Sequence, residues 1–168
     1  PRAAGKFKYP AELVPSASGD LYVADGYRNS RVHRFSNDGR LKKSWGEPGK
    51  QAPNEFHLPH SLLVDGDNVV DCDRENDRIQ VFSLDGEFKE IWDDIQRPMD
   101  ISMDTDGNYM ISEGQRDNSA RISILDKKGG VLSRFNCRGS GHGSWIDSRG
   151  DIYLGGVPEA IDKYVRQN

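Results

Sequence analysis

The stretch from Phe56 to Phe82 reads FHLPHSLLVDGDNVVDCDRENDRIQVF and holds the clearest copy of a unit that recurs along the chain. The unit has the order Pro-x-x-Leu, an apolar strand, a tight turn of Gly, Asp or Asn, and a second apolar strand ending in an acid. A polar loop, an Arg and a third strand complete it. A repeat of this kind indicates a fold assembled from similar modules.

Four copies of the unit align. Their first strands begin at Pro10, Pro59, Pro98 and Gly141, so the starts lie 49, 39 and 43 residues apart. The second strands are DLYVAD from Asp20, NVVDCD from Asn68, NYMISE from Asn108 and DIYLGG from Asp151, and the third strands are RVHRF from Arg31, RIQVF from Arg78, RISIL from Arg121 and KYV from Lys163. The first three copies then turn into a fourth strand, LKKSW, FKEIW or VLSRF.

The spacing is typical of a four-stranded antiparallel propeller blade of about 40 to 50 residues. Asp-Gly and Gly-Asp pairs suit short hairpin turns, and β-branched and aromatic residues fill the strands between them. The sequence therefore predicts an all-β propeller in one domain, residues 1–168, with repeats at about 10–57, 58–96, 97–138 and 139–168. About four blades are present, which form either a closed ring of four or part of a longer ring.

Composition narrows the classes of partner. The chain has 168 residues, 35% of them hydrophobic, and a formal charge of -4 with acids and bases interleaved. No basic stripe tracks a phosphate backbone, so we expect no nucleic acid partner. No apolar run approaches the roughly 20 residues that span a bilayer, so we expect a soluble chain without a membrane span. The first residue is not Met, and removal of a leader would make a secreted or periplasmic location compatible with the sequence.

Several residues recur with the repeat and indicate architecture. An Arg opens the third strand in three copies, at Arg31, Arg78 and Arg121. An acid ends the second strand in the same copies, at Asp25, Asp73 and Glu113, where a carboxylate can cap the N–H groups of a loop. We interpret both sets as residues that stabilise the blades.

The second copy departs from the pattern. It is one residue shorter between Pro59 and Asn68, and it has Asp71 where the other copies have an aliphatic residue. Because a slip of one residue reverses the faces of a strand, we expect this blade to be locally distorted.

The position after the first-strand Pro or Gly also varies, and it holds Ala11, His60, Met99 and His142. First strands line the channel of a propeller, so His60 and His142 are candidates to converge on one metal. Imidazole is a suitable zinc ligand, although a catalytic zinc takes three protein ligands. The alternative is that both histidines line a wet channel. His33 and His57 are interpreted as packing or surface residues.

Two loops after second strands carry further candidates. Tyr27 in DGYRNSR and Arg74 in DRENDR have no counterpart in the other repeats at the level of sequence. An Arg can hold a carboxylate with two hydrogen bonds, and a Tyr beside a metal can act as a general base. Both loops are expected at the same end of the channel as His60 and His142.

These motifs resemble a known family. The segments DGYRNSR, SWGEPG, F-x-LPHSL, DRENDRIQVF and HGSWIDSRGDIYLGG look like the NHL-repeat propeller of peptidyl-α-hydroxyglycine α-amidating lyase and its bacterial relatives, from about Lys8 to Arg166. The resemblance implies a six-bladed ring with a zinc held by three histidines and a nearby calcium. It implies cleavage of peptidyl-α-hydroxyglycine into a peptide amide and glyoxylate.

By that resemblance, His60 and His142 correspond to two of the zinc histidines, Tyr27 to the catalytic tyrosine and Arg74 to an active-site arginine. The chain also departs from the family. The blades with the third zinc histidine and a second arginine are absent, and Gly143 replaces the calcium-binding Asp.

Two functions are therefore open. One is a zinc-dependent C–N lyase, with calcium as a further cofactor and a peptide or small molecule in the channel. The other is a non-catalytic propeller that binds a protein or small ligand. In either case, self-association to complete the ring is a third possibility, because unpaired blade faces need a partner.

Overall fold

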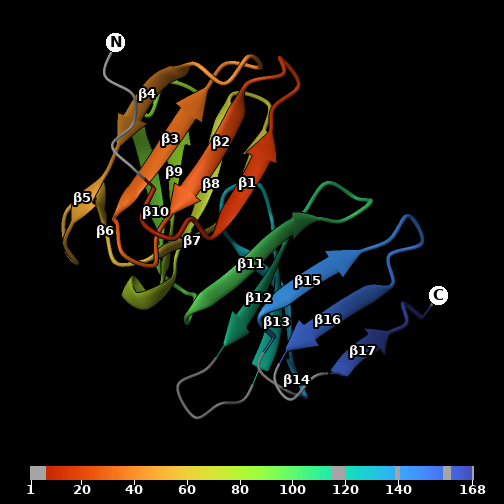
Figure 1. Ribbon diagram of the computed structural model, residues 1–168. Helices are drawn as coiled ribbons and strands as arrows, with labels where there is room; N and C mark the ends of the chain where they lie inside the picture. Colours follow the sequence, from red (N-terminus) through yellow and green to blue (C-terminus); the bar gives the residue numbers. More distant parts are fainter. Residues whose placement is uncertain (1–6, 115–119, 139–140, 157–159, 168) are drawn as a thin grey trace. The chain divides into compact units, whose positions relative to one another are not determined.

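The computed structural model describes residues 7–114, 120–138, 141–156 and 160–167. The chain forms two compact units, Pro1–Asp93 and Asp94–Asn168, and Figure 1 shows strands throughout both. The described strands are β1 (Glu12–Pro15), β2 (Leu21–Asp25), β3 (Arg31–Phe35), β4 (Leu41–Trp45), β5 (Glu47–Pro48), β6 (Glu55–Phe56), β7 (Pro59–Asp65), β8 (Asn68–Asp73), β9 (Arg78–Ser83), β10 (Phe88–Trp92), β11 (Pro98–Met103), β12 (Tyr109–Gly114), β13 (Ala120–Leu125), β14 (Val131–Cys137), β15 (Gly143–Ile146), β16 (Ile152–Gly156) and β17 (Ala160–Tyr164). A single turn of 3-10 helix, η1 (Arg74–Asn76), follows β8.

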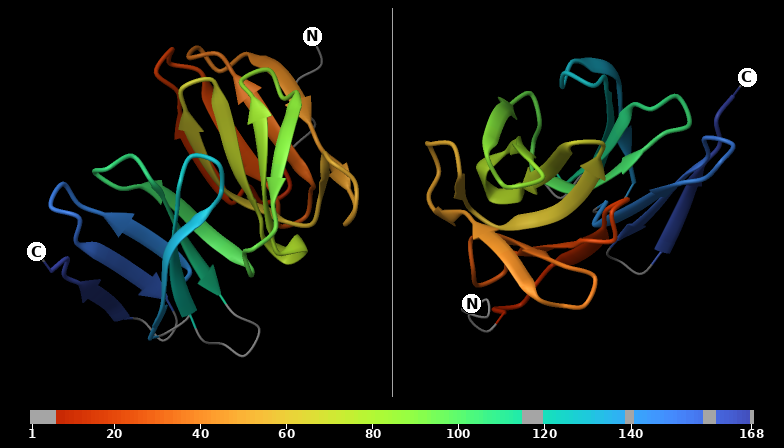
Figure 2. Two further views of the ribbon diagram at one scale, coloured as in Figure 1. Left: turned by 180° about the vertical axis from the view of Figure 1, so that it is seen from behind. Right: turned by 90° about the horizontal axis from the view of Figure 1, so that it is seen from above.

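The first unit contains two four-stranded sheets. Their strand orders are β1-β2-β3-β4 and β10-β9-β8-β7, and every neighbouring pair within them is antiparallel. Figure 2 shows the second of these sheets from behind. The short strands β5 and β6 pair in parallel in the connection between the two sheets. Each sheet is a chain of consecutive hairpins, which is the blade that the repeat predicts.

Aromatic and aliphatic side chains fill the space between these two sheets. The buried cluster comprises Tyr22, Ala24, Val32, Trp45, Phe56, Leu62, Val69 and Phe82. The hairpin before β10 fits closely against it, because a Cβ on Gly86 would lie 2.6 Å from the ring of Trp45. The same glycine has a φ of 76°, which favours Gly in a short hairpin. The turn conformation and the packing against Trp45 therefore both favour Gly at position 86.

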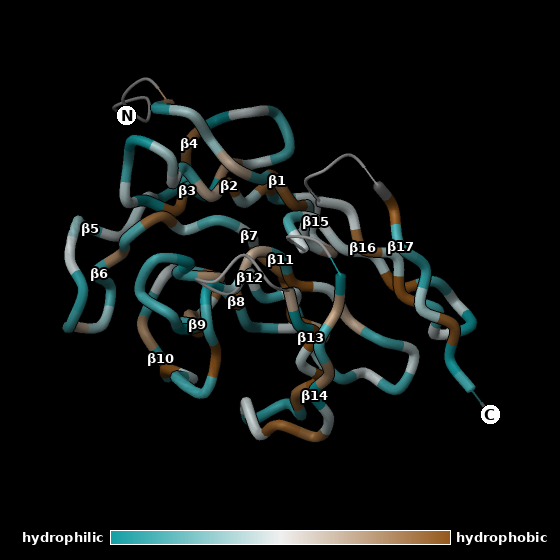
Figure 3. The backbone as a smooth tube through the Cα atoms, turned by 90° about the horizontal axis from the view of Figure 1, so that it is seen from below, coloured by the Kyte–Doolittle hydropathy of each residue, from teal (hydrophilic) through white to brown (hydrophobic). Residues whose placement is uncertain are grey.

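The second unit contains a four-stranded sheet of order β11-β12-β13-β14 and a sheet in which three strands are described, β15-β16-β17. Met110, Ala120 and Ile122 of the first sheet form a core with Ile152 and Leu154 of the second. Figure 3 shows hydrophobic residues along strands such as β13 and hydrophilic residues in the turns between strands. This alternation is expected when apolar strands pack and polar turns meet water.

The sequence prediction of blades is confirmed, with one local correction. The third strand of the fourth repeat is β17, Ala160–Tyr164, which begins before the predicted start at Lys163. It begins earlier because Gly156 pairs with Ala160 across the hairpin, so the ladder extends to the end of β16. Among the described residues, no helix is long and apolar enough to cross a membrane.

The register of the second blade shifts in its first hairpin. Pro59 pairs with Asp73 and Leu62 pairs with Asp71, so β7 carries an extra residue between these two pairs. A similar shift separates Pro98 from Asp100 on β11. An extra residue at the start of the first strand is therefore shared by two blades, and a bulge of this kind redirects nearby side chains.

Candidate functional site

The acids that end the second strands each bind a segment that precedes their blade. In all three cases a backbone N–H donates to the carboxylate. The donors and acceptors are Lys8 to Asp25 (3.0 Å), His57 to Asp73 (2.8 Å) and Gln96 to Glu113 (2.6 Å). The prediction that these carboxylates cap loop N–H groups is confirmed. Each acid thereby holds the approaching chain at the end of its blade where the candidate site residues lie.

Two of the recurring arginines pair with these acids. Arg78 donates from Nε to Asp73 at 2.8 Å, and both side chains are buried. Arg121 donates from Nη2 to Glu113 at 2.7 Å. Burial of Asp73 raises the pKa of its carboxyl, against the lowering effect of its hydrogen bonds from Asn76, His57 and Arg78. The interpretation of Arg78 and Arg121 as residues that stabilise the blades is consistent with these pairs.

Arg31 differs from the other two arginines. It is exposed, and its side chain has no ion pair or hydrogen bond among the described residues. Asp25 instead accepts a hydrogen bond from Asn29 at 2.8 Å and lies 3.5 Å from Nε2 of His33. His33 is buried, which lowers the pKa of its imidazole against the raising effect of Asp25. His33 is buried beside Asp25, in agreement with the interpretation of this residue as a packing residue.

The loops that carry Tyr27 and Arg74 occupy equivalent places in their blades. Tyr9 and Leu58, which directly precede the first-strand prolines, have φ values of 64° and 74°. The carbonyl of Tyr9 accepts from N–H of Tyr27 at 3.3 Å, and that of Leu58 accepts from N–H of Arg74 at 3.2 Å. In sequence neither residue has a counterpart, but in the structure each is the counterpart of the other. The extra residue Gly26 hides this equivalence in the alignment.

Gly26 brings Tyr27 close to His60. A Cβ on Gly26 would lie only 2.0 Å from the carbonyl oxygen of Pro59, so the loop runs directly against the start of β7. Only Gly permits so close an approach of two backbones. The hydroxyl of Tyr27 consequently lies 3.0 Å from Nε2 of His60, and the two rings meet edge to face at a centroid distance of 5.6 Å.

Arg74 completes this group. Its guanidinium carbon lies 5.6 Å from the centroid of the Tyr27 ring, and its Nε donates to Glu75 at 2.9 Å. The Arg74 side chain is 11% exposed. Nη1 and Nη2 have no hydrogen-bond partner within the described part of the chain. We call the three residues Tyr27, His60 and Arg74 the tyrosine cluster.

The tyrosine cluster combines a buried and an exposed part. His60 is 6% exposed, whereas Tyr27 is 44% exposed. Part of Tyr27 therefore faces solvent, whereas the imidazole of His60 is shielded from it. The hydroxyl is able to donate to a neutral imidazole or to accept from it, depending on which ring nitrogen carries the proton.

His142 lies in the second unit and follows Gly141. Gly141 is buried, with a φ of 58°, and its Cβ position would lie 3.1 Å from Cβ of Ala120. The His142 side chain is exposed. Gly141 thus has a left-handed backbone, as do Tyr9, Leu58 and Arg97, which lie one position earlier in their repeats.

The fit of a metal to these residues depends on the number of donors. Among residues 7–114, 120–138, 141–156 and 160–167, no group of three or more His, Cys, Asp or Glu side chains is arranged to hold an ion. In the first unit, Nε2 of His60 already interacts with the Tyr27 hydroxyl. The tyrosine cluster by itself therefore does not complete a zinc site, which needs three protein ligands or more.

Asp71 is a buried acid that the sequence marked only as an irregularity of the repeat. Its side chain is 0% exposed, and neither carboxylate oxygen has a hydrogen-bond partner among the described residues. Burial raises the pKa of Asp71 well above its usual range, and the nearby acids Asp73 and Glu12 raise it further. Glu12 itself accepts a hydrogen bond from N–H of Leu62 at 2.6 Å. Strongly shifted carboxyls are enriched at functional sites, although packing also produces them.

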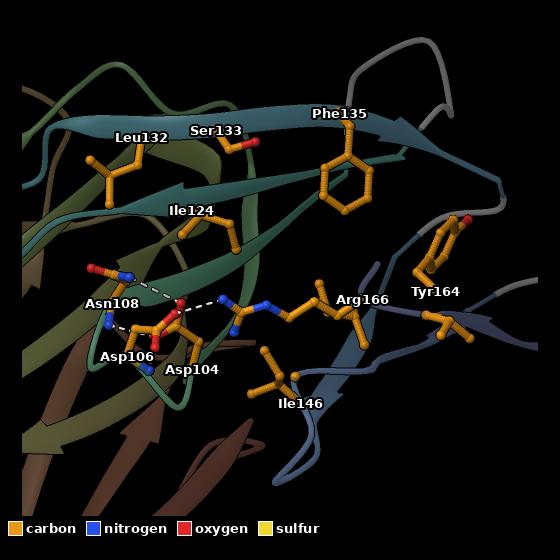
Figure 4. A pocket seen from close by; sticks show the side chains of 13 residues that line it. Asp104, Asp106, Asn108, Ile124, Leu132, Ser133, Phe135, Ile146, Tyr164 and Arg166 are labelled. Atoms are coloured by element: carbon orange, nitrogen blue, oxygen red, sulfur yellow. Dashed lines mark hydrogen bonds and ion pairs between the residues drawn. The ribbon is translucent and has the colours of Figure 1, made fainter. Parts of the chain in front are cut away.

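The second unit contains a separate pocket of about 410 Å³. Figure 4 shows apolar side chains around it, including Leu132, Phe135 and Ile146, and a charged end where Arg166 meets Asp106. Arg166 and Asp106 are paired at 3.0 Å, and Asp104 accepts hydrogen bonds within its own turn. Arg166 pairs with Asp106 and Asn108 with Asp104, so these four polar side chains of the lining bind one another.

Comparisons with known proteins agree with the fold. No family model matches the chain. Peptidyl-glycine alpha-amidating monooxygenase B of Xenopus laevis is 43% identical over 76 residues, which are 42% of this chain and 9% of that protein. A probable peptidyl-alpha-hydroxyglycine alpha-amidating lyase of Caenorhabditis elegans is 39% identical over 74 residues, 42% of this chain and 21% of that protein. NHL repeat-containing protein 3 of Mus musculus is 35% identical over 127 residues, 71% of this chain and 36% of that protein.

Among solved structures, the WD40 beta propeller domain of Doa1 superposes with a TM-score of 0.71 at 15% identity, over 95% of this chain and 51% of that chain. The chain is therefore an all-β protein of the β-propeller class, with NHL-type blades. Its homologues include α-amidating lyases and NHL repeat proteins, at modest identity over part of their length. The chain spans less than a quarter of the first amidating relatives that it matches.

Proposed function

We propose that the chain is an NHL propeller related to the amidating lyases, and that the tyrosine cluster is its reactive site. The observation that carries the proposal is the 3.0 Å contact between the Tyr27 hydroxyl and Nε2 of His60, with Arg74 beside the same ring. These are three of the four residues that the sequence selected. The proposed reaction cleaves the C–N bond of a peptidyl-α-hydroxyglycine to a peptide amide and glyoxylate.

In this proposal Tyr27 accepts the proton of the substrate, and His60 accepts the proton of the Tyr27 hydroxyl. In the proposed step, the phenolic oxygen of Tyr27 takes the proton of the substrate hydroxyl while the phenol proton moves to Nε2 of His60. The hydroxyl carbon becomes the aldehyde of glyoxylate as its bond to the amide nitrogen breaks. That nitrogen takes a proton from the Tyr27 hydroxyl, and the proton on Nε2 of His60 returns to the phenolic oxygen, so both residues recover their starting state. General acid and base groups of this kind typically contribute about 10²-fold to 10⁴-fold to a rate.

Arg74 is the proposed partner of the substrate carboxylate. Its Nη1 and Nη2 offer two parallel donors, which match the two oxygens of a carboxylate. Glu75 occupies Nε at 2.9 Å, so it fixes the guanidinium but also offsets part of its charge. We expect Arg74→Lys to bind the substrate more weakly, because a lysine cannot reproduce the two-pronged geometry.

Zinc at His60 and His142, with calcium as a further ion, stays part of the proposal. When bound, zinc polarises a substrate hydroxyl as a Lewis acid. Nε2 of His60 cannot accept from Tyr27 and bind zinc at the same time, so the two uses of His60 exclude each other on that nitrogen. Elemental analysis of dialysed wild-type protein and of His60→Ala separates them: about one zinc per chain, lost in the variant, supports the metal site.

The assay for the proposed reaction is glyoxylate release from an N-acyl-α-hydroxyglycine peptide. We expect Tyr27→Phe to lower kcat by about 100-fold or more, because it removes the group that takes the proton. Tyr153→Phe, which removes a phenolic hydroxyl on β16, is the matched control and should keep the wild-type rate. No release by wild-type protein, with or without added zinc, would exclude the lyase function.

The second candidate is a non-catalytic propeller that binds a protein or small ligand. The observation that favours it is the pairing of Arg74 with Glu75, because a neighbouring acid weakens the attraction for a substrate carboxylate. Binding of a partner that is unchanged by Tyr27→Phe and Arg74→Ala supports this function. Self-association stays a prediction, and exposed apolar residues such as Leu13 and Ile161 are consistent with it. Light scattering tests it, since a monomer has a mass of 18.8 kDa.

A further inference from the structure

A surface pocket of about 560 Å³ borders the tyrosine cluster on the first unit. It is lined by Tyr9, Pro10, Tyr27 and Arg28. Tyr27 belongs to both features, because its hydroxyl meets His60 while its ring forms part of the pocket wall. A molecule that reaches the Tyr27 hydroxyl therefore passes beside this pocket.

The walls of the pocket are held in place by the backbone. N–H of Lys8 donates to the carboxylate of Asp25 at 3.0 Å. N–H of Tyr27 donates to the carbonyl of Tyr9 at 3.3 Å, and N–H of Arg28 donates to that of Lys8 at 3.0 Å. These bonds fasten the segment before β1 across the loop that carries Tyr27. These bonds fix the backbone from which the Tyr9 side chain projects.

The side chains of the pocket are those that recognise aromatic groups. The Tyr9 side chain is 62% exposed, so it contributes little to the core. The guanidinium carbon of Arg28 lies 4.9 Å from the centroid of the Tyr9 ring. Single exposed apolar residues are common on protein surfaces, but two exposed rings with a stacked guanidinium around one pocket are typical of recognition sites.

We propose that this pocket binds an aromatic side chain of a peptide substrate, on the residue that precedes the α-hydroxyglycine. The inference rests on the proposed function, since it places the reacting group at Tyr27. Adjacent Cα atoms lie about 3.8 Å apart, so the preceding residue is within one step of the group at the Tyr27 hydroxyl. Ring stacking against Tyr9 favours Phe or Tyr at that position over Ala, and Arg28 disfavours Lys or Arg by charge repulsion.

The test measures binding of unreactive probes, so that it does not depend on turnover. N-acetyl-Phe-Gly and N-acetyl-Ala-Gly are titrated into the wild-type chain by calorimetry. We expect the Phe probe to bind about tenfold more tightly, the effect of burying roughly half of a phenyl ring. Tyr9→Ala should reduce that ratio to below about threefold. Trp145→Ala removes an exposed aromatic ring on the second unit and should leave the ratio unchanged.

The outcomes separate this inference from the proposed function. A Phe preference that depends on Tyr9, without glyoxylate release from the hydroxyglycine substrates, supports the pocket and excludes the lyase. Glyoxylate release with equal kcat/KM for the Phe and Ala substrates supports the lyase and overturns the pocket. Equal binding of the two probes, binding of neither, or tighter binding of N-acetyl-Glu-Gly also overturns it.

Discussion

Replacement of Asp71 by Val should stabilise the first unit. Asp71 lies on β8 with both carboxylate oxygens buried and without partners among the described residues. The other blades have aliphatic residues at this point of the repeat, and the first blade has Val23 there. A buried polar group that lacks its hydrogen bonds costs about 1–3 kcal/mol. We therefore expect Asp71→Val to raise the free energy of unfolding of the first unit by about 2 kcal/mol, which corresponds to roughly 8–16 °C in Tm for a unit of this size.

The gain should depend on pH in a defined direction. The pKa of Asp71 is raised in the folded protein, chiefly by burial and then by Asp73 and Glu12. The folded state therefore holds its proton more tightly than the unfolded chain does, whose carboxyl has a pKa of about 3.9. The wild-type protein loses this contribution to stability as the pH rises from about 4 through the folded pKa. The advantage of Asp71→Val should grow over the same interval.

The assay is equilibrium unfolding in urea, followed by tryptophan fluorescence. Trp45 and Trp92 are buried in the first unit, so their emission reports its unfolding, whereas Trp145 is exposed. Asp71→Asn is the matched control, because a buried amide still lacks partners and should recover less stability than Val. If Asp71→Val instead lowers the free energy of unfolding by about 1 kcal/mol or more, the carboxyl makes an interaction that this reasoning omits.

Two further substitutions test how the structure positions the loops and the acids. Gly26→Ala should destabilise the first unit by about 3 kcal/mol, because the added Cβ would lie 2.0 Å from the carbonyl oxygen of Pro59. Gly143→Ala is the control and should change stability little, because no atom lies within 4 Å of its Cβ position. Equal effects of the two substitutions would refute the steric argument. Arg78→Ala should lower the free energy of unfolding by about 3–5 kcal/mol, because it leaves the buried Asp73 carboxylate without its cation. Urea unfolding measures this change, and a decrease below about 1 kcal/mol would contradict the importance of the Arg78–Asp73 pair.

The repeat also shows which features of the molecule follow from local sequence. Turns such as the one at Gly86 and the alternation of apolar residues are local properties, so the residue pattern alone is enough to assign the strands and hairpins. The same applies to the acids that end the second strands, because their role depends on their place in the repeat. Arg31 shows the limit of this reasoning, since it opens a third strand like Arg78 and Arg121 but is exposed and does not pair with Asp25 among the described residues.

The sequence by itself determined the all-β blades and their order, and it selected Tyr27, His60, Arg74 and His142 as candidate site residues. Only the tertiary structure decided that Tyr27 reaches His60, since that contact depends on a backbone approach between Gly26 and Pro59, 33 residues apart. It also decided that Asp71 is buried among other acids, because the environment of a side chain between two sheets is set by residues distant in sequence. A one-dimensional pattern specifies periodicity, whereas burial and contact arise only when the sheets pack.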